Sequence, residues 1–303
     1  MYLVWGSTYL AIRVAVATMP PLLTAGVRFF VAGLIILAIV GLRRGLTGLR
    51  VTRTELVGAG IVGAGLVAGG NGLVMLAERD VPSALAALII ASVPLWVVVL
   101  RTATGQRVAR GALAGVLIGF VGVAVLVLPA GLSGAGHALG LFLLVAAAAS
   151  WASGSFLSQR LRLPADLLLS TALQMTTGGL LVAIVGLLVG EGTKFDVAAF
   201  APESLVAVAY LLVFGSLLAF TAYSWLLQNA PISQVATYAY VNPVVAVILG
   251  WAILAEEITP VMLAGAVLIV ASVAVVVRHE AASRSGSSRE ASSLPTAAQA
   301  EGA

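Results

Sequence analysis

Hydrophobic residues form ten long runs along this chain, and short polar segments separate each run from the next. A helix that crosses the hydrocarbon core of a membrane needs about 20 predominantly apolar residues, within a range of about 17–25. Prolines stand at many of the proposed helix ends, where a missing backbone N–H costs little. The pattern therefore predicts an all-α polytopic membrane protein. The ten expected transmembrane helices span residues 1–16, 22–42, 55–77, 82–100, 111–129, 138–158, 166–189, 203–227, 231–254 and 260–277.

The two ends of the chain depart from this pattern. The first run is short for a span, and we expect its helix to begin upstream of Met1. Residues 279–303 are rich in Ser, Ala, Arg and Glu and have no apolar period. Such a segment cannot bury enough apolar surface to fold, so it is predicted to be a disordered tail.

The composition excludes the soluble classes of protein. The chain is 61% hydrophobic and 9% charged, whereas a soluble domain is about 25% charged. The net charge of +4 is interpreted as loop charge that orients a membrane protein, so no nucleic-acid partner is expected. There is no cysteine, and neither His137 nor His279 has the spacing of a metal ligand. No metal and no cofactor are therefore expected.

Lysine and arginine fall almost entirely on one side of the predicted topology. The loops after the second, fourth and sixth helices, together with the tail, hold 12 of the 16 basic residues. The opposite side holds only Arg79 and Lys194. Positive charge is concentrated in cytoplasmic loops. The bias predicts that both termini lie in the cytoplasm and that the number of helices is even. The expected location is a bacterial plasma (inner) membrane.

The second half of the chain repeats features of the first in the same order. The pentapeptide AIVGL occurs at 38–42 and at 183–187, and Trp5-x-Ser7 matches Trp151-x-Ser153. Two prolines twelve residues apart occur in each half, at 82 and 94 and again at 231 and 243. Five helices in each copy, at 1–130 and 136–278, force the second copy into the membrane upside down. Inverted repeats are typical of secondary transporters, with a substrate site at the repeat interface near the midplane.

Several segments resemble bacterial EamA-type members of the drug/metabolite transporter superfamily. The resemblance covers nearly the whole chain except the tail. It rests on WGSTYLAIR at 5–13, the proline pair at 20–21, RFFVAGL at 28–34, YVNPVVA at 240–246 and EEIT at 256–259. It implies two inverted EamA repeats and a central cavity built mainly from the first, third, fourth, sixth, eighth and ninth helices. It does not imply a particular substrate.

Charged side chains inside or at the ends of the predicted helices are the first candidates for chemistry. A charge in the hydrocarbon core is costly, and such residues usually face protein or water. Arg13 and Arg28 are candidates for contact with a substrate anion; the alternatives are snorkelling to headgroups for Arg13 and a structural pairing with Glu78 for Arg28. Glu78 and Glu256 are candidates for proton coupling or gating, or else simply end their helices.

Proline and polar groups within the predicted helices are the second set of candidates. Pro94 and Pro243 are expected to interrupt the fourth and ninth helices at equivalent positions, either as cavity elements or as structural kinks. The other expected cavity residues carry aromatic, hydroxyl or amide groups, which are costly when they face lipid. They are Trp5, Ser7, Thr8, Asn71, Trp151, Ser153, Tyr223, Tyr238, Tyr240 and Asn242. Packing between helices and an interfacial aromatic belt are the alternatives for the amide and the tryptophans.

Together these features predict a secondary transporter that is neither an enzyme nor driven by ATP. It is expected to move small metabolites by alternating access, and to export amino acids or related amphipathic solutes. A nucleotide-sugar or sugar-phosphate carrier is the alternative within the superfamily, and an intramembrane enzyme is the alternative of another class. The expected partners are the lipid bilayer and a small-molecule substrate. A GxxxGxxxG ridge at Gly111, Gly115 and Gly119 serves packing within the bundle or a homodimer.

Overall fold

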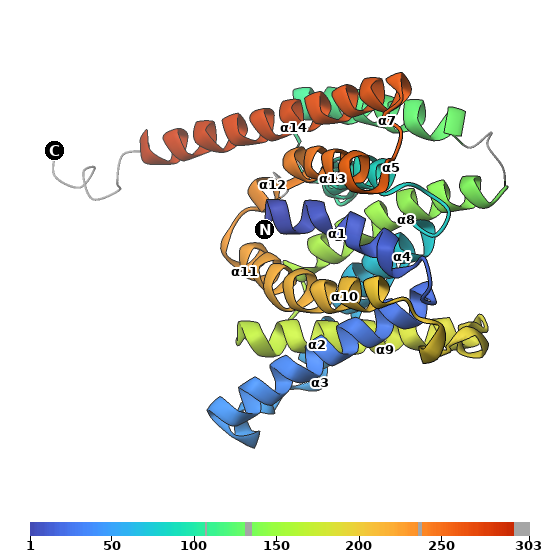
Figure 1. Ribbon diagram of the computed structural model, residues 1–303. Helices are drawn as coiled ribbons and strands as arrows, with labels where there is room; N and C mark the ends of the chain where they lie inside the picture. Colours follow the sequence, from blue (N-terminus) through green and yellow to red (C-terminus); the bar gives the residue numbers. More distant parts are fainter. Residues whose placement is uncertain (107, 131–134, 236–237, 294–303) are drawn as a thin grey trace.

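The computed structural model describes residues 1–106, 108–130, 135–235 and 238–293, and all regular secondary structure in these residues is helical (Figure 1). The N-terminal half contains α1 (Tyr2–Ala15), α2 (Pro21–Arg44), η1 (Leu46–Leu49), α3 (Arg53–Gly63), η2 (Ala64–Gly72), α4 (Leu73–Ala77), α5 (Ser83–Ile90), α6 (Val93–Ala103) and α7 (Arg110–Ala130). The C-terminal half contains α8 (Ala135–Ser158), α9 (Leu167–Leu188), η4 (Glu191–Lys194), η5 (Val197–Ala199), α10 (Pro202–Tyr210), η6 (Leu211–Phe220), α11 (Thr221–Asn229), α12 (Ile232–Val235), α13 (Tyr238–Leu254) and α14 (Pro260–Ser293). Each hydrophobic run of the sequence coincides with a helix or with a series of consecutive helices.

The lengths of these helical runs confirm a polytopic membrane protein. Eight of the described runs are long and apolar enough to cross a membrane. The ninth run of the sequence has a shorter apolar helix at Val241–Leu254, and α1 is 14 residues long. At 1.5 Å per residue, 14 residues rise about 21 Å, which is less than the roughly 30 Å hydrocarbon core. The count of ten spanning helices stays a prediction.

The halves of the chain pack against each other through matching helices. α2 lies along α9, and α7 lies along α14. Between these outer pairs, α1 packs on α13 and α10, while α8 packs on η2, α4 and α6 (Figure 1). Glycines permit the closest approach: a Cβ on Gly33 of α2 would lie 2.8 Å from the carbonyl oxygen of Ala172 in α9. The central helices α1 and α8 thus each pack mainly against the other half of the chain.

Two helices are π-helical in their middles, which the sequence pattern did not predict. η2 interrupts the third predicted helix between α3 and α4, and η6 interrupts the eighth between α10 and α11. A π-helical turn bonds i to i+5, so it rotates the following side chains relative to an α-helix. Such turns are frequent at functional sites. Both segments face the interior of the molecule, where η2 contacts α8 and η6 contacts α1.

The two prolines expected to break helices behave differently. Between α5 and α6, residues Ala91 and Ser92 form a turn just before Pro94, so the predicted interruption is present. The expected break at Pro243 is wrong, because α13 continues through it. Pro243 is the sixth residue of α13, so its missing N–H removes one bond near the start and the following turns are intact.

The C-terminal helix is longer than the hydrophobic pattern indicates. α14 continues to Ser293, beyond the predicted helix end at residue 277 and into the segment expected to be disordered. The added segment contains no proline before residue 295, and it combines good helix formers (Ala, Arg and Glu) with weaker ones (Ser and Gly286). A hydrophobic period reports a buried helix face, so it did not signal a helix in a segment with few apolar residues.

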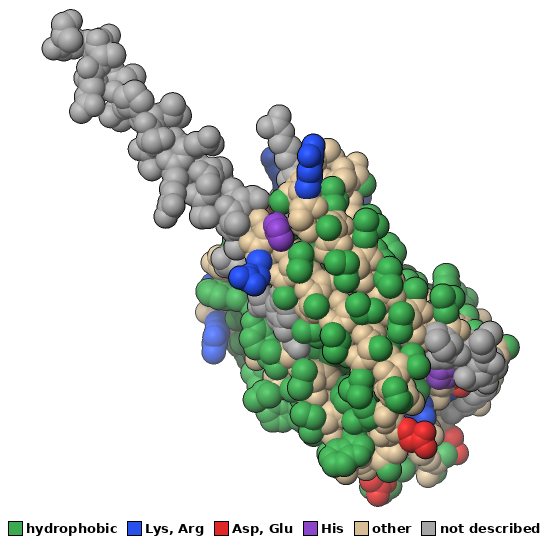
Figure 2. Space-filling model, turned by 90° about the horizontal axis from the view of Figure 1, so that it is seen from above, with side chains coloured by type: hydrophobic (Ala, Val, Ile, Leu, Met, Phe, Trp, Pro, Cys, Tyr) green, Lys and Arg blue, Asp and Glu red, His purple; other side chains and the backbone are tan. Residues whose placement is uncertain are grey.

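The outside of the bundle suits a lipid environment. Seen from the side of α7 and α14, hydrophobic side chains cover the middle of the molecule (Figure 2). Arg side chains lie toward one end of this face and Asp and Glu side chains gather toward the other (Figure 2). Leu117 is 70% exposed and Val267 is 67% exposed, as expected for side chains that contact lipid tails.

Candidate functional site

A cavity lies at the centre of the bundle, between the two halves of the chain. Six of the residues expected from the sequence line it: Trp5, Thr8, Asn71, Trp151, Tyr238 and Asn242. The lining also includes Tyr9, Ile12, Phe29, Gly70, Val74, Ile90, Ala147, Gly215 and Phe220. The cavity is small, about 60 Å³, which is room for roughly four to six water molecules at 10–15 Å³ each. A metabolite therefore needs a wider conformation of the same site.

Four aromatic side chains from both halves pack together beside this cavity: Trp5, Trp151 and Tyr238 line it, and Tyr223 packs against them without lining it. The ring of Trp5 contacts those of Trp151, Tyr223 and Tyr238 at centroid distances of 5.4, 4.9 and 5.1 Å. The Trp151 indole N–H donates to the Tyr223 hydroxyl at 2.9 Å, and that hydroxyl also bonds Ser155 at 2.6 Å. Edge-to-face ring contacts and satisfied polar tips make this wall rigid. We call these four residues the aromatic wall.

An arginine without an acidic partner stands behind the cavity. Arg28 is buried, with 3% of its surface exposed, and donates to the Asn71 side-chain oxygen at 3.2 Å. Its Nε has no hydrogen-bond partner, and no carboxylate of the described residues lies within ion-pair distance of it. The alternative interpretation, a structural pairing of Arg28 with Glu78, is therefore not present among the described residues. A buried cation with an open donor is a ready contact for an anion.

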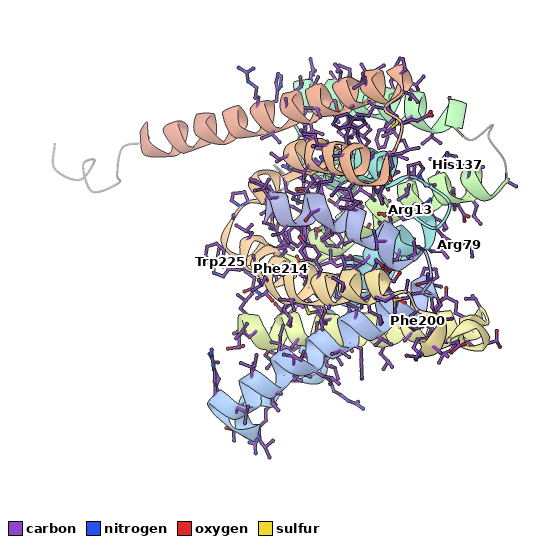
Figure 3. The ribbon with its side chains drawn as sticks, in the orientation of Figure 1. Arg13, Arg79, His137, Phe200, Phe214 and Trp225 are labelled. Atoms are coloured by element: carbon purple, nitrogen blue, oxygen red, sulfur yellow. The ribbon has the colours of Figure 1, made fainter. Side chains whose placement is uncertain are left out.

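A second group of charges lies at the end of the bundle where α1 and α4 end. Arg13 donates to the backbone carbonyl oxygens of Glu78 and of Arg79, the latter at 2.8 Å. Glu78 is fully buried and neither of its carboxyl oxygens has a hydrogen-bond partner. Burial raises the pKa of the Glu78 carboxyl well above its ordinary value, the charge of Glu256 raises it further, and Arg13 lowers it. Arg13 and Arg79 lie toward the same end as His137 (Figure 3).

Glu256 binds across the two halves at this end. It follows α13, and its carboxylate accepts the backbone N–H groups of Ser83 and Ala84 at 2.8 and 2.9 Å. It also accepts the Ser83 hydroxyl at 2.8 Å. A carboxylate is favourable at a helix N-terminus because of the free N–H groups and the helix dipole. We call this contact the Glu256 cap of α5.

The remaining sequence candidates lie outside the cavity lining. Ser7 bonds the Tyr210 hydroxyl at 2.6 Å, and Ser153 donates to a carbonyl of its own helix at 2.8 Å. Pro94 is the second residue of α6, and Pro243 lines an apolar pocket beside α14. Tyr240 is in α13, but its side chain lies outside the described residues.

Several aromatic and aliphatic residues of the cavity lining were not predicted from the sequence. Tyr9 and Ile12 follow Trp5 and Thr8 at helical spacing, so the face of α1 could have been extended by counting i, i+3, i+4 and i+7. Phe29 and Phe220 come from helices far apart in the chain, and their rings lie 5.8 Å apart. Nothing in their local sequence signals that contact.

The fold and this cavity define a class of protein: a polytopic helical bundle whose central site is shared by two halves. The EamA-like transporter family model matches residues 1–128 and again residues 138–278. The chain therefore belongs to the EamA-like transporter family, and the protein is a multi-pass inner membrane transporter of the drug/metabolite transporter type.

Named relatives are found in several bacteria. The chain is 36% identical over 263 residues to the "Uncharacterized inner membrane transporter YedA" of Escherichia coli strain K12, covering 86% of this chain and 83% of the relative. It is 28% identical over 276 residues to the "Probable amino-acid metabolite efflux pump" of Salmonella typhimurium, covering 88% and 89%. A solved structure, titled only as the crystal structure of a protein, has a TM-score of 0.64 at 24% identity and covers 90% and 92% of the two chains. That likeness concerns the fold alone.

Proposed function

We propose that this protein is a secondary transporter that exports amino acids or related amphipathic solutes carrying a carboxylate. The observation that supports this cargo most directly is buried Arg28, which has no acidic partner among the described residues and lies behind Asn71 of the cavity. A substrate carboxylate reaching this guanidinium would supply the missing counter-charge. The aromatic wall would contact the apolar part of the same molecule. The name of the Salmonella relative agrees with this class of cargo.

Alternating access about the cavity is the proposed mechanism. We propose ten transmembrane helices in two inverted repeats, at 1–130 and 136–278, with both termini in the cytoplasm and residues 279–303 as a cytoplasmic tail. The cross-packing of α2 on α9 and of α7 on α14, and the paired π-helical segments η2 and η6, support this symmetry. Rocking of one five-helix half against the other would expose the cavity to each side in turn. No step in this cycle calls for catalysis, so the protein is proposed not to be an enzyme.

The cargo is tested by thermal shift of the purified protein with L-amino acids, their decarboxylated amines, and nucleotide-sugars. A ligand that binds only the folded state stabilises it by about 2.7 kcal/mol at a hundredfold excess over Kd. We expect an amino acid to raise the Tm and its decarboxylated amine not to. The hit is then measured as transport into proteoliposomes.

Variants of Arg28 test whether its guanidinium contacts the substrate carboxylate. Arg28→Met should abolish the shift, because it removes the guanidinium at similar volume. Arg28→Lys should keep a weaker thermal shift, since lysine retains the positive charge but lacks the planar guanidinium that binds a carboxylate through two N–H groups. The Arg28 guanidinium lies over the ring of Phe29, 4.3 Å from its centroid. Arg160→Met is the matched control, because Arg160 likewise lies over a ring, that of Phe156, but is exposed. A full shift in Arg28→Met would contradict the anion contact, and stabilisation by nucleotide-sugars alone would replace the proposed cargo.

A further inference from the structure

The side chain of Glu78 is buried at a site where its ionised form is energetically unfavourable. It is fully buried, and both of its carboxyl oxygens are without hydrogen-bond partners. The guanidinium of Arg13 lies close by but donates to backbone carbonyl oxygens, including that of Glu78 itself. A carboxylate without a partner in such a place takes up a proton. In this arrangement Glu78 is therefore neutral.

A second carboxylate close to Glu78 holds the two halves of the chain together. The Glu256 cap joins the segment after α13 to the N-terminus of α5, through three hydrogen bonds of 2.8–2.9 Å. Glu78 lies one short loop before α5 in the chain, and the charge of Glu256 acts on it. Two nearby carboxylates resist ionising together. Ionisation of Glu78 therefore weakens the Glu256 cap.

Groups that interact electrostatically with Glu78 line two open spaces. Tyr9 of α1 lines the central cavity, whereas Arg13 and Glu256 line an outer pocket at the end of the bundle. The other charged or titratable groups that the structure describes around these spaces include Arg79 and Asp80 in its own loop, Glu203 of the outer pocket, and Glu257 beside Glu256. They also include His137 of α8, whose ring nitrogen bonds the Asp80 carbonyl oxygen at 3.0 Å. Glu78 differs from these groups in being fully buried without a partner.

We propose that Glu78 is a proton-binding site of this transporter, and that its protonation state controls the Glu256 cap and hence the opening of the cavity at this end. With the proton bound, the cap holds and the halves stay together. When the proton leaves, the Glu78 carboxylate repels Glu256, the cap loosens, and the halves separate at α5. The inference rests on the proposed transport function, but its test uses no substrate.

The test measures the separation across the Glu256 cap. The chain has no cysteine, so cysteines at Arg79 and Ile258, whose side chains are exposed, can carry one spin label each. Distances between the labels are measured in nanodiscs from about pH 5 to about pH 9, which spans the range where buried carboxyl groups titrate. We expect a short distance at low pH and a growing longer population as the pH rises.

Three variants separate the proposal from its rivals. Glu78→Gln should give the short distance at every pH, and Glu256→Gln should give the longer one at every pH. Glu257→Gln is the matched control beside Glu256, since Glu257 is exposed, and it should keep the pH response. His137→Gln should keep it as well, because histidine is the other residue type that titrates in this range.

Two results would overturn the proposal: no pH response in the parent chain, or a response that persists in Glu78→Gln. If Glu78→Gln does not fold, the comparison of the parent with Glu256→Gln decides. The proposal expects Glu256→Gln to show the longer distance at every pH, without a pH response. A pH response like that of the parent in Glu256→Gln would refute the proposal. A positive result stands even if the cargo proves not to be an amino acid.

Discussion

The close contact between α2 and α9 leads to a stability prediction that compares two glycines on one helix. An alanine Cβ at position 33 would lie 2.7 Å from the Thr176 backbone nitrogen and 2.8 Å from the Ala172 carbonyl oxygen. Both are backbone atoms of α9, which cannot rotate away, so the two helices must move apart by several tenths of an ångström. At position 41 the nearest atom is a methyl carbon of Leu49 at 3.5 Å, an ordinary contact. Gly33→Ala should therefore destabilise the protein and Gly41→Ala should not.

The magnitude follows from two terms. Replacing glycine by alanine inside a helix gains about 1 kcal/mol of helix propensity, and this gain is common to both variants. Overpacking at a tight contact costs about 1–3 kcal/mol. Gly33→Ala should thus be about 1–3 kcal/mol less stable than Gly41→Ala, with Gly41→Ala equal to or above the parent. The shared propensity term cancels in that difference, which leaves the packing term alone.

The measurement is thermal unfolding of the three chains in one detergent, followed by the fluorescence of the five tryptophans and by circular dichroism. A difference of 1 kcal/mol shifts the Tm of a chain of 303 residues by about 1.6 °C. Equal Tm values for Gly33→Ala and Gly41→Ala would refute the reasoning, because they would show that α2 and α9 are not held at this spacing.

Three further predictions concern single polar groups. Glu191→Gln should lower the stability by about 1–2 kcal/mol in the same thermal assay, because the Glu191 carboxylate accepts the Leu23 N–H at 2.8 Å at the start of α2. Tyr223→Phe should cost about 1–3 kcal/mol, because Ser155 and an indole N–H lose their buried partner, and a parent-like Tm would contradict it. Because the pKa of Glu78 is raised in the folded protein, its contribution to stability should fall as the pH rises above its ordinary range, by up to about 1.4 kcal/mol per pH unit. Glu78→Gln should lack this dependence of stability on pH, so the Tm of the variant relative to the parent should rise from pH 4 to pH 8. Parallel curves of Tm against pH for the two chains would refute the raised pKa of Glu78.

The sequence by itself determined the class of this protein and the composition of its site. Ten apolar runs fix helices in a membrane, because no other element but a closed barrel satisfies its backbone in lipid. The buried polar candidates were also accessible from sequence: Trp5, Asn71 and Trp151 line the cavity because amide and indole groups are costly against lipid. The residue type and its position along the predicted helix are enough to indicate that such a side chain faces the interior, whatever its neighbours are.

Only the tertiary structure decided which groups pair and which are left without a partner. From sequence, Glu78 could have neutralised Arg28, whereas packing places Asn71 beside Arg28 and Arg13 beside Glu78. The π-helical segments and the continuous helix through Pro243 are equally invisible in a hydrophobic pattern, since both depend on what packs against the helix. The contact between Glu256 and α5 joins residues more than 170 positions apart. Such contacts are set by the way the two halves pack, and a local pattern of apolar residues, which reports burial and period, contains no information about partners.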